Sequence, residues 1–124
     1  MDTKVISVAM KELRKLYGNK YLNQKEWADD PDHVYIGRAR SVIIKDKTGT
    51  TRWPAASSPF HNPYTVADHG REQALVLYKQ YIIDKLQDPE FHLELKSLKG
   101  KTLGCWCKPE SCHGDILLEL LNMI

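Results

Sequence analysis

The chain has 124 residues, of which 42% are hydrophobic, and its 18 basic and 16 acidic side chains leave a net charge of +2. This length supports one hydrophobic core, so we expect a single domain over 1–124. No apolar run approaches the roughly 20 residues that a membrane-spanning helix needs, and the N-terminus is charged and periodic, unlike a secretory signal. We therefore expect a soluble, cytoplasmic protein without a membrane partner.

The first segment, 1–32, predicts a helix and a loop. Apolar side chains recur every three or four residues over 3–17, with Asp2 as a cap and Gly18 as the stop, which is typical of an amphipathic helix. The polar and acidic stretch 19–32 predicts a loop, with room for one helical turn.

The middle of the chain predicts strands and a long loop. A short β-rich run covers 33–38, and 41–53 is typical of a hairpin that turns at Thr48 and Gly49. Three of the six prolines follow in 54–70, where a long ordered loop in a compact domain is more often functional than idle.

The C-terminal half predicts three helices and one strand. Apolar spacing predicts a long helix from Gly70 onward, and Pro89 is favoured at the first position of a second helix that ends near Leu98. A strand at 99–107 and a closing helix from Cys112 complete the order. A helical crossover of this length returns the chain in the same direction, so the two main strands should be parallel. The expected fold is a small Rossmann-like α/β domain with a short, mainly parallel sheet flanked by helices, plus a β-hairpin and an extra N-terminal helix.

Four blocks of the chain resemble one known family. These are VYIGR, SPFHNPY, GREQALVLYKQYI and LKGKTLGCWCKPESCHGDILLELL. They are similar to successive blocks of DUF4326, a family of domains of unknown function found in phages, bacteria and large viruses, over about 33–122. The resemblance implies a core at 33–124 and brings no settled activity. His61 stands where members usually carry glycine, and the hairpin and the N-terminal helix resemble additions.

All three cysteines lie close together, at Cys105, Cys107 and Cys112. Their odd number and their clustering predict reduced thiols inside the cell. Cys105 and Cys107 should share one strand face, with Cys105 in the core, while Trp106 points to the other face. Cys112 begins a helix, where the dipole favours a thiolate, and this predicts a reactive cysteine.

Three interpretations of this cluster remain open. Catalytic or ligand-facing roles are favoured for Cys107, Cys112, His113 and Asp115. Simple packing is the second, and a structural zinc site is the third. The zinc ligands would be Cys105, Cys107, Cys112 and His113, although their spacing differs from that of common zinc knuckles.

A binding site for an anion is predicted at the carboxyl ends of the strands, where ligands of such sheets bind. Arg38 and Arg40 follow the first predicted strand, and Arg71 opens the long helix beside backbone amides that could hold phosphate. The predicted ligand-binding residues are Gly37, Arg38, Asn62, Arg71 and Trp106. The aromatic residues Trp53, Phe60 and Tyr64 could stack on bases but more often pin such a loop to its domain.

Two functions follow as hypotheses. The first is a protein that binds or processes a nucleotide-like or other phosphate-bearing small molecule, as a hydrolase or transferase if it is an enzyme, with no required cofactor. The second is a non-catalytic module, stabilised by zinc, that binds nucleic acid or a host protein. The sequence leaves the oligomeric state open.

Overall fold

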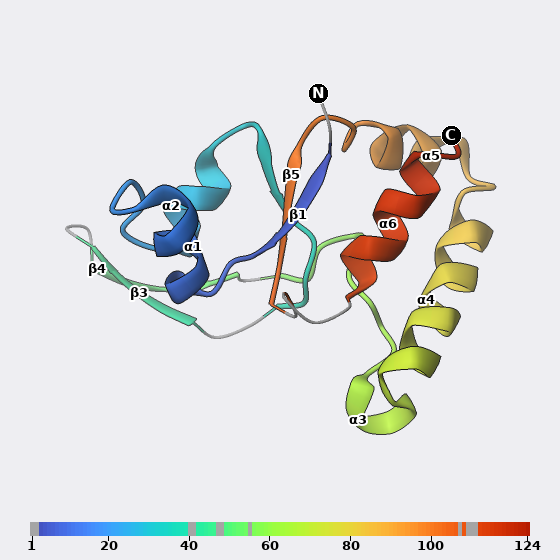
Figure 1. Ribbon diagram of the computed structural model, residues 1–124, viewed down its shortest axis with the longest axis horizontal. Helices are drawn as coiled ribbons and strands as arrows, with labels where there is room; N and C mark the ends of the chain where they lie inside the picture. Colours follow the sequence, from blue (N-terminus) through green and yellow to red (C-terminus); the bar gives the residue numbers. More distant parts are fainter. Residues whose placement is uncertain (1–2, 40–41, 47–48, 55, 107, 109–111) are drawn as a thin grey trace.

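The computed structural model describes residues 3–39, 42–46, 49–54, 56–106, 108 and 112–124 (Figure 1). A three-stranded parallel sheet forms its centre, with strands β1 (Lys4–Ser7), β5 (Thr102–Cys105) and β2 (His33–Tyr35) in the order β1-β5-β2. The central strand β5 pairs on both sides, so that Leu103 lies opposite Val5 and Val34. The predicted parallel pairing of the two main strands is confirmed, and β1 is an additional edge strand.

The prediction of one helix over 3–17 is wrong. Residues Lys4–Ser7 form β1, and the helix α1 covers only Met10–Tyr17 before it ends at Gly18. Val5 packs on one side of the sheet, while Ile6 packs on the other. Because both faces of a parallel strand are buried, its apolar residues form a continuous run without alternation. When such a run directly precedes a helix, its apolar residues also fit the three- and four-residue spacing of that helix, and the sequence then predicts one long helix.

The predicted loop at 19–32 contains the six-residue helix α2 (Gln24–Asp29), somewhat more than the single helical turn that was predicted as possible. The Asn23 side chain accepts a hydrogen bond from Glu26 N at 2.9 Å, and the Glu26 side chain accepts one from Leu22 N at 3.0 Å. These contacts form a capping arrangement from an Asn-x-x-Glu pattern. That pattern was the available sequence signal for this helix.

Three predicted helices are confirmed, namely α4 (Arg71–Lys85), α5 (Pro89–Lys96) and α6 (His113–Leu121). The short helix α3 (Val66–His69) lies within the segment 54–70, which was predicted as a loop. Asp88 caps α5 by accepting a hydrogen bond from Glu90 N at 3.0 Å, with Pro89 at the first helical position. The mixed α/β class with a short parallel sheet flanked by helices is therefore confirmed.

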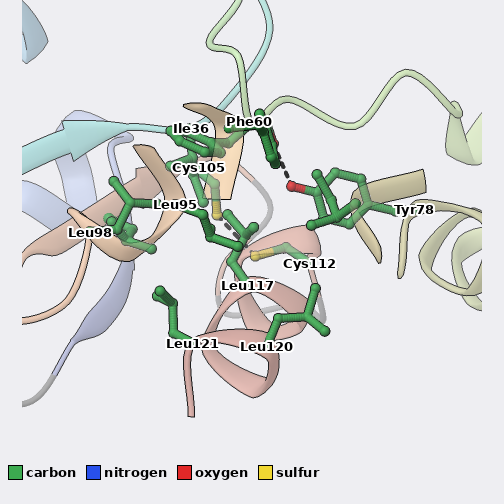
Figure 2. Packing of buried hydrophobic residues seen from close by; sticks show 13 residues of the cluster. Ile36, Phe60, Tyr78, Leu95, Leu98, Cys105, Cys112, Leu117, Leu120 and Leu121 are labelled. Carbon is green, nitrogen blue, oxygen red and sulfur yellow. Dashed lines mark hydrogen bonds between the residues drawn. The ribbon is translucent and has the colours of Figure 1, made fainter. Parts of the chain in front are cut away.

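Two hydrophobic clusters lie on opposite faces of the sheet. Helices α1 and α2 cover one face, and α4, α5 and α6 cover the other (Figure 1). Trp27 of α2 and Val8 are fully buried in the smaller cluster. Figure 2 shows the larger cluster, in which Tyr78 and Leu117 pack beside the sulfur atoms of Cys105 and Cys112. The sheet is thus a middle layer, and its strand ends are the places left for a site.

The predicted hairpin is present as β3 (Val42–Asp46) and β4 (Gly49–Trp53), which pair antiparallel. It extends to one side of the main sheet below α1 in the view of Figure 1. Thr48, the first residue of the predicted turn, lies outside the described residues. None of the helices formed by the described residues has the length and apolar character required to cross a membrane.

Candidate functional site

A hollow of about 210 Å³ lies beyond the carboxyl ends of β2 and β5. Four segments supply its described lining, which consists of Gly37, Arg38, Asn62, Tyr64, Thr65, Val66, Trp106 and His113. Figure 1 shows the end of β5, the start of α6 and the helix α3 toward the same lower end of the molecule. The structure therefore gathers Gly37, Arg38, Asn62, Trp106 and His113 at the strand edge where the sequence places a site.

Arg38 is held in position by a backbone carbonyl. Its Nε and Nη2 atoms both donate to the Asn62 carbonyl oxygen, at 2.8 and 2.5 Å. A guanidinium has five N–H donors, so about three remain after these two bonds. The Arg38 side chain is half-buried and lines the hollow. It is therefore a fixed cation with donors available for an anion.

Asn62 binds Arg38 through its backbone carbonyl and not through its side-chain amide. Its side-chain Oδ1 accepts a hydrogen bond from Tyr64 N at 2.9 Å, and its Nδ2 lies 3.4 Å from the Ala74 carbonyl oxygen. The first contact is an Asx turn, which shapes the loop so that the Asn62 carbonyl faces Arg38. Asn62 is thus part of the lining, with its side chain engaged in loop structure.

Tyr35 connects two walls of the hollow. Its hydroxyl donates to the Arg38 carbonyl at 2.6 Å and accepts a hydrogen bond from Trp106 Nε1 at 2.8 Å. Its ring also lies over Gly37, where an added Cβ would stand 2.6 Å from the Tyr35 Cζ atom. Any larger side chain at Gly37 would displace that ring. Sequence reasoning missed Tyr35 because its position within a strand suggested only packing.

A Tyr35→Phe variant should lose about 1–2 kcal/mol of unfolding free energy, because the Arg38 carbonyl and the Trp106 indole each lose a hydrogen-bond partner. Urea denaturation followed by tryptophan fluorescence measures this loss. The matched control is Tyr21→Phe, which removes a hydroxyl that reaches Asp30 at 3.4 Å and should cost less. Equal losses in the two variants would contradict the connecting role of Tyr35.

His113 is the first residue of α6 and is 7% exposed. Its Nε2 lies 2.7 Å from the Ile36 carbonyl oxygen, which can only accept, so Nε2 carries the proton. Burial lowers the pKa of His113 and outweighs the opposing hydrogen bond to Ile36, and the nearby Arg38 guanidinium lowers it further. The ring is therefore neutral at pH 7, and its Nδ1 atom carries a lone pair that can accept a proton or a hydrogen bond.

Cys112 lies in the core and not in the hollow. It is 1% exposed, and its Sγ lies 3.1 Å from the Sγ of Cys105. The hydrogen bond with Cys105 and burial raise the pKa of the Cys112 thiol. The helix N-terminus was expected to favour a thiolate here, but desolvation opposes the charged form more strongly. Cys105 is in the core as predicted, and Cys107 lies outside the described residues.

Asp115 supports the start of α6. Its Oδ2 accepts a hydrogen bond from Cys112 N at 3.1 Å, and its Oδ1 accepts one from Lys108 Nζ at 2.5 Å. A carboxylate at this position caps the helix and interacts favourably with its dipole. Asp115 is not part of the described lining of the hollow.

The three predicted arginines do not all meet in the described lining. Arg71 begins α4 and is half-buried, but among the described lining residues Arg38 is the one with a permanent charge. Arg40 lies outside the described residues. The sequence placed Arg71 at the site because α4 follows the proline-rich loop, yet the short helix α3 intervenes and its first residue, Val66, reaches the hollow instead.

The aromatic residues of the proline-rich loop divide between packing and the site. Phe60 is buried, and its carbonyl accepts a hydrogen bond from Tyr78 at 2.5 Å, while the rings of Trp53 and Tyr35 lie 4.9 Å apart. Tyr64 lines the hollow. Together with Thr65 and Val66 it was not assigned to the site, and a single exposed apolar residue such as Val66, 47% exposed, gives no signal of a site in the sequence.

The zinc interpretation stays a prediction. Within the described part of the chain, no group of three or more His, Cys, Asp or Glu side chains is placed to hold a metal ion. Cys105 and Cys112 offer two sulfur atoms side by side, but His113 uses its Nε2 atom on Ile36. Metal analysis of the purified protein tests this interpretation, which also involves Cys107.

Comparisons with known proteins give relatives of undetermined role. The chain is 39% identical over 67 residues to an uncharacterised 12.4 kDa protein from the nrdA-td intergenic region of Enterobacteria phage T4, covering 52% of this chain and 62% of the phage protein. It is 30% identical over 99 residues to an uncharacterised protein of Acanthamoeba polyphaga mimivirus, covering 73% of this chain and 68% of that protein. The chain thus spans less than two thirds of the phage relative's length. No solved structure matches the chain.

The sequence profile of the family DUF4326, a domain of unknown function, matches residues 19–123. The match covers β2, β5, α6 and every described residue that lines the hollow. It also extends the resemblance found at 33–122 toward the N-terminus, so that α2 is included. The chain belongs to the DUF4326 family.

Proposed function

We propose that the hollow binds a small molecule that carries a phosphate group and a planar ring, such as a nucleotide or a nucleoside derivative. The observation that carries the proposal is the Arg38 guanidinium, fixed by the Asn62 carbonyl with about three N–H donors left over. Arginine in a fixed orientation binds phosphate through paired hydrogen bonds. A site that is ordered in advance loses less entropy when its ligand binds.

The charge of the hollow also favours an anion. No Asp or Glu occurs among its described lining residues, and the neighbouring carboxylate of Asp115 is paired with Lys108. The Arg38 guanidinium supplies a permanent positive charge beside His113. The proposal further relies on the general rule that parallel α/β sheets, including Rossmann-like ones, bind ligands beyond the carboxyl ends of their strands.

Trp106 and Tyr64 supply the surface for a ring. Both line the hollow, and the Trp106 indole nitrogen is engaged with Tyr35, which fixes the plane of the indole. Bases stack on such aromatic faces with a gain of about 1–3 kcal/mol per base. The volume of about 210 Å³ is smaller than the roughly 300–1,000 Å³ of ligand pockets in general, so a bound nucleotide would extend partly out of the hollow.

Any catalysis at this site would use His113. Its Nδ1 atom can accept a proton, while Nε2 stays bound to the Ile36 carbonyl and orients the ring. The burial of Cys112 makes that thiol a weaker candidate for the nucleophile. A hydrolase or transferase that acts on a nucleotide derivative remains the class of enzyme to test.

The test is isothermal titration of the reduced protein with inorganic phosphate, AMP and adenosine. We expect AMP to bind more tightly than either fragment, because it engages both Arg38 and the aromatic wall. An Arg38→Gln variant should weaken AMP binding about tenfold or more, since a charged hydrogen bond contributes about 1.5–3 kcal/mol. Arg14→Gln, at an exposed position of α1 outside the described lining of the hollow, is the matched control and should bind like the wild type. Equal affinity of Arg38→Gln and wild type for AMP would sink the proposal.

A further inference from the structure

We propose that Cys105 and Cys112 form an intramolecular disulfide when a peroxide oxidises the protein, and that this bond alters ligand binding in the hollow. The first half of the statement concerns only the two sulfur atoms. The second half rests on the proposed function, since it treats the hollow as a binding site.

The two sulfur atoms are already close. Their Sγ atoms lie 3.1 Å apart, and a disulfide bond measures about 2.05 Å, so an approach of about 1 Å completes it. Figure 2 shows the two side chains pointing toward each other inside the larger cluster, one from β5 and the other from the start of α6. Seven positions separate them in the sequence, so the bond would close a short loop.

The position of the pair links it to the hollow. Cys105 is the last residue of β5 and directly precedes Trp106, while Cys112 directly precedes His113. Trp106 and His113 both line the hollow. A bond between the sulfur atoms would therefore act on the two chain segments that carry these walls.

The oxidation balances with a peroxide as the only co-reactant. One cysteine sulfur attacks an oxygen of hydrogen peroxide, the O–O bond breaks, and a sulfenic acid and one water form. The sulfur of the second cysteine then displaces the hydroxyl of the sulfenic acid as a second water, and the S–S bond forms. Two S–H bonds are lost in total, and the two electrons and two protons end on the oxygen atoms of the two waters.

Burial decides which reagent can act. Cys105 is 0% exposed and Cys112 is 1% exposed, so a bulky alkylating reagent reaches neither thiol in the folded protein. Hydrogen peroxide is little larger than water and can enter during small openings of the core. We expect the reaction to be slow in the folded state, because the thiolate is the reactive form and the pKa of the Cys112 thiol is raised.

The experiment is intact-mass spectrometry of a Cys107→Ser variant after peroxide treatment, which leaves Cys105 and Cys112 as the remaining cysteines. We expect the mass to fall by that of two hydrogen atoms and to recover on reduction. Circular dichroism before treatment confirms that the variant is folded. A matched variant that carries Cys107→Ser together with Cys105→Ala should gain oxygen or form a dimer instead, because its single thiol has no partner.

The wild-type chain gives an independent check that does not depend on any variant. Cleavage at Glu110, between Cys107 and Cys112, should yield two joined peptides, of which the first contains both Cys105 and Cys107. Fragmentation of that peptide at Trp106 in the mass spectrometer should then place the bond to Cys112 on Cys105. Peptides joined through Cys107 instead, or a mass without the loss of two hydrogens in the Cys107→Ser variant, would overturn the assignment of the pair.

The effect on the hollow is measured by titrating AMP into the reduced and oxidised forms of the Cys107→Ser variant. We expect the dissociation constant to change at least threefold, together with a rise of the melting temperature of about 5 °C or more as the short loop is closed. If reduced protein does not bind AMP, the proposed function fails while the disulfide result stands. If the disulfide forms and AMP binds equally to both forms, the coupling to the hollow is wrong.

Discussion

A Gly104→Val variant should lose about 3 kcal/mol or more of unfolding free energy, the largest effect of a single added side chain that we expect in this chain. Gly104 lies in the central strand β5, and an ideal Cβ there would stand 2.5 Å from Cη2 of Trp27 and close to Cγ1 of Val8. Trp27 is fully buried and cannot move toward solvent. Stable domains of this size have about 5–15 kcal/mol in total, so the loss is a large part of the stability.

Chemical denaturation measures the effect, and a double-mutant cycle identifies its cause. Gly104→Ala and Val8→Ala should each destabilise the protein, but the combined variant should be more stable than the sum of the two losses predicts, because shortening Val8 makes room for the new methyl group. Strict additivity would mean that the steric contact with Val8 is not the cause. Gly104→Val should also raise the dissociation constant of any ligand, since Trp106 directly follows the end of β5.

A His113→Ala variant should lose about 2–4 kcal/mol, because a buried ring is removed and the Ile36 carbonyl loses its donor. His113→Gln should lose less, since its amide nitrogen can still donate to that carbonyl. Both losses are measured by denaturation at pH 7.5, where the wild-type imidazole is neutral.

The same variants test the protonation of His113. Burial lowers the pKa of His113 in the folded chain below its usual value of 6.5. As the pH falls below 6.5, the unfolded chain therefore takes up a proton before the folded chain does, and the free energy of unfolding decreases. This loss continues until the pH reaches the lowered pKa of the folded state. His113→Gln removes the contribution, so its stability should vary less between pH 7 and pH 5.

His69→Gln provides the control for these pH profiles. His69 is exposed on α3, and its replacement should leave the slope of the wild type unchanged. A wild-type slope in His113→Gln would show that His113 is not buried in its neutral form. In that case Nδ1 would also carry a proton, and its assignment as an acceptor in the hollow would have to be abandoned.

Most helices and the hairpin were predictable because their signals are local. The start of α5 follows from Asp88 and Pro89, whose capping oxygen and fixed backbone act within one turn. The strand β1 was not predictable in this way. Val5 and Ile6 face different clusters, so no alternation marked them as a strand, and only their pairing with β5 distinguishes them from a helical turn.

The candidate site shows the same division. The sequence by itself determined that Arg38, Trp106 and His113 follow strands or begin a helix, and the parallel topology then brings such positions to one edge of the sheet. Only the tertiary structure decided that Cys112 faces Cys105 in the core while the adjacent His113 faces the hollow. The local dipole of α6 favours a thiolate, but the free energy of removing a charge from water depends on which residues surround it, and packing alone fixes that.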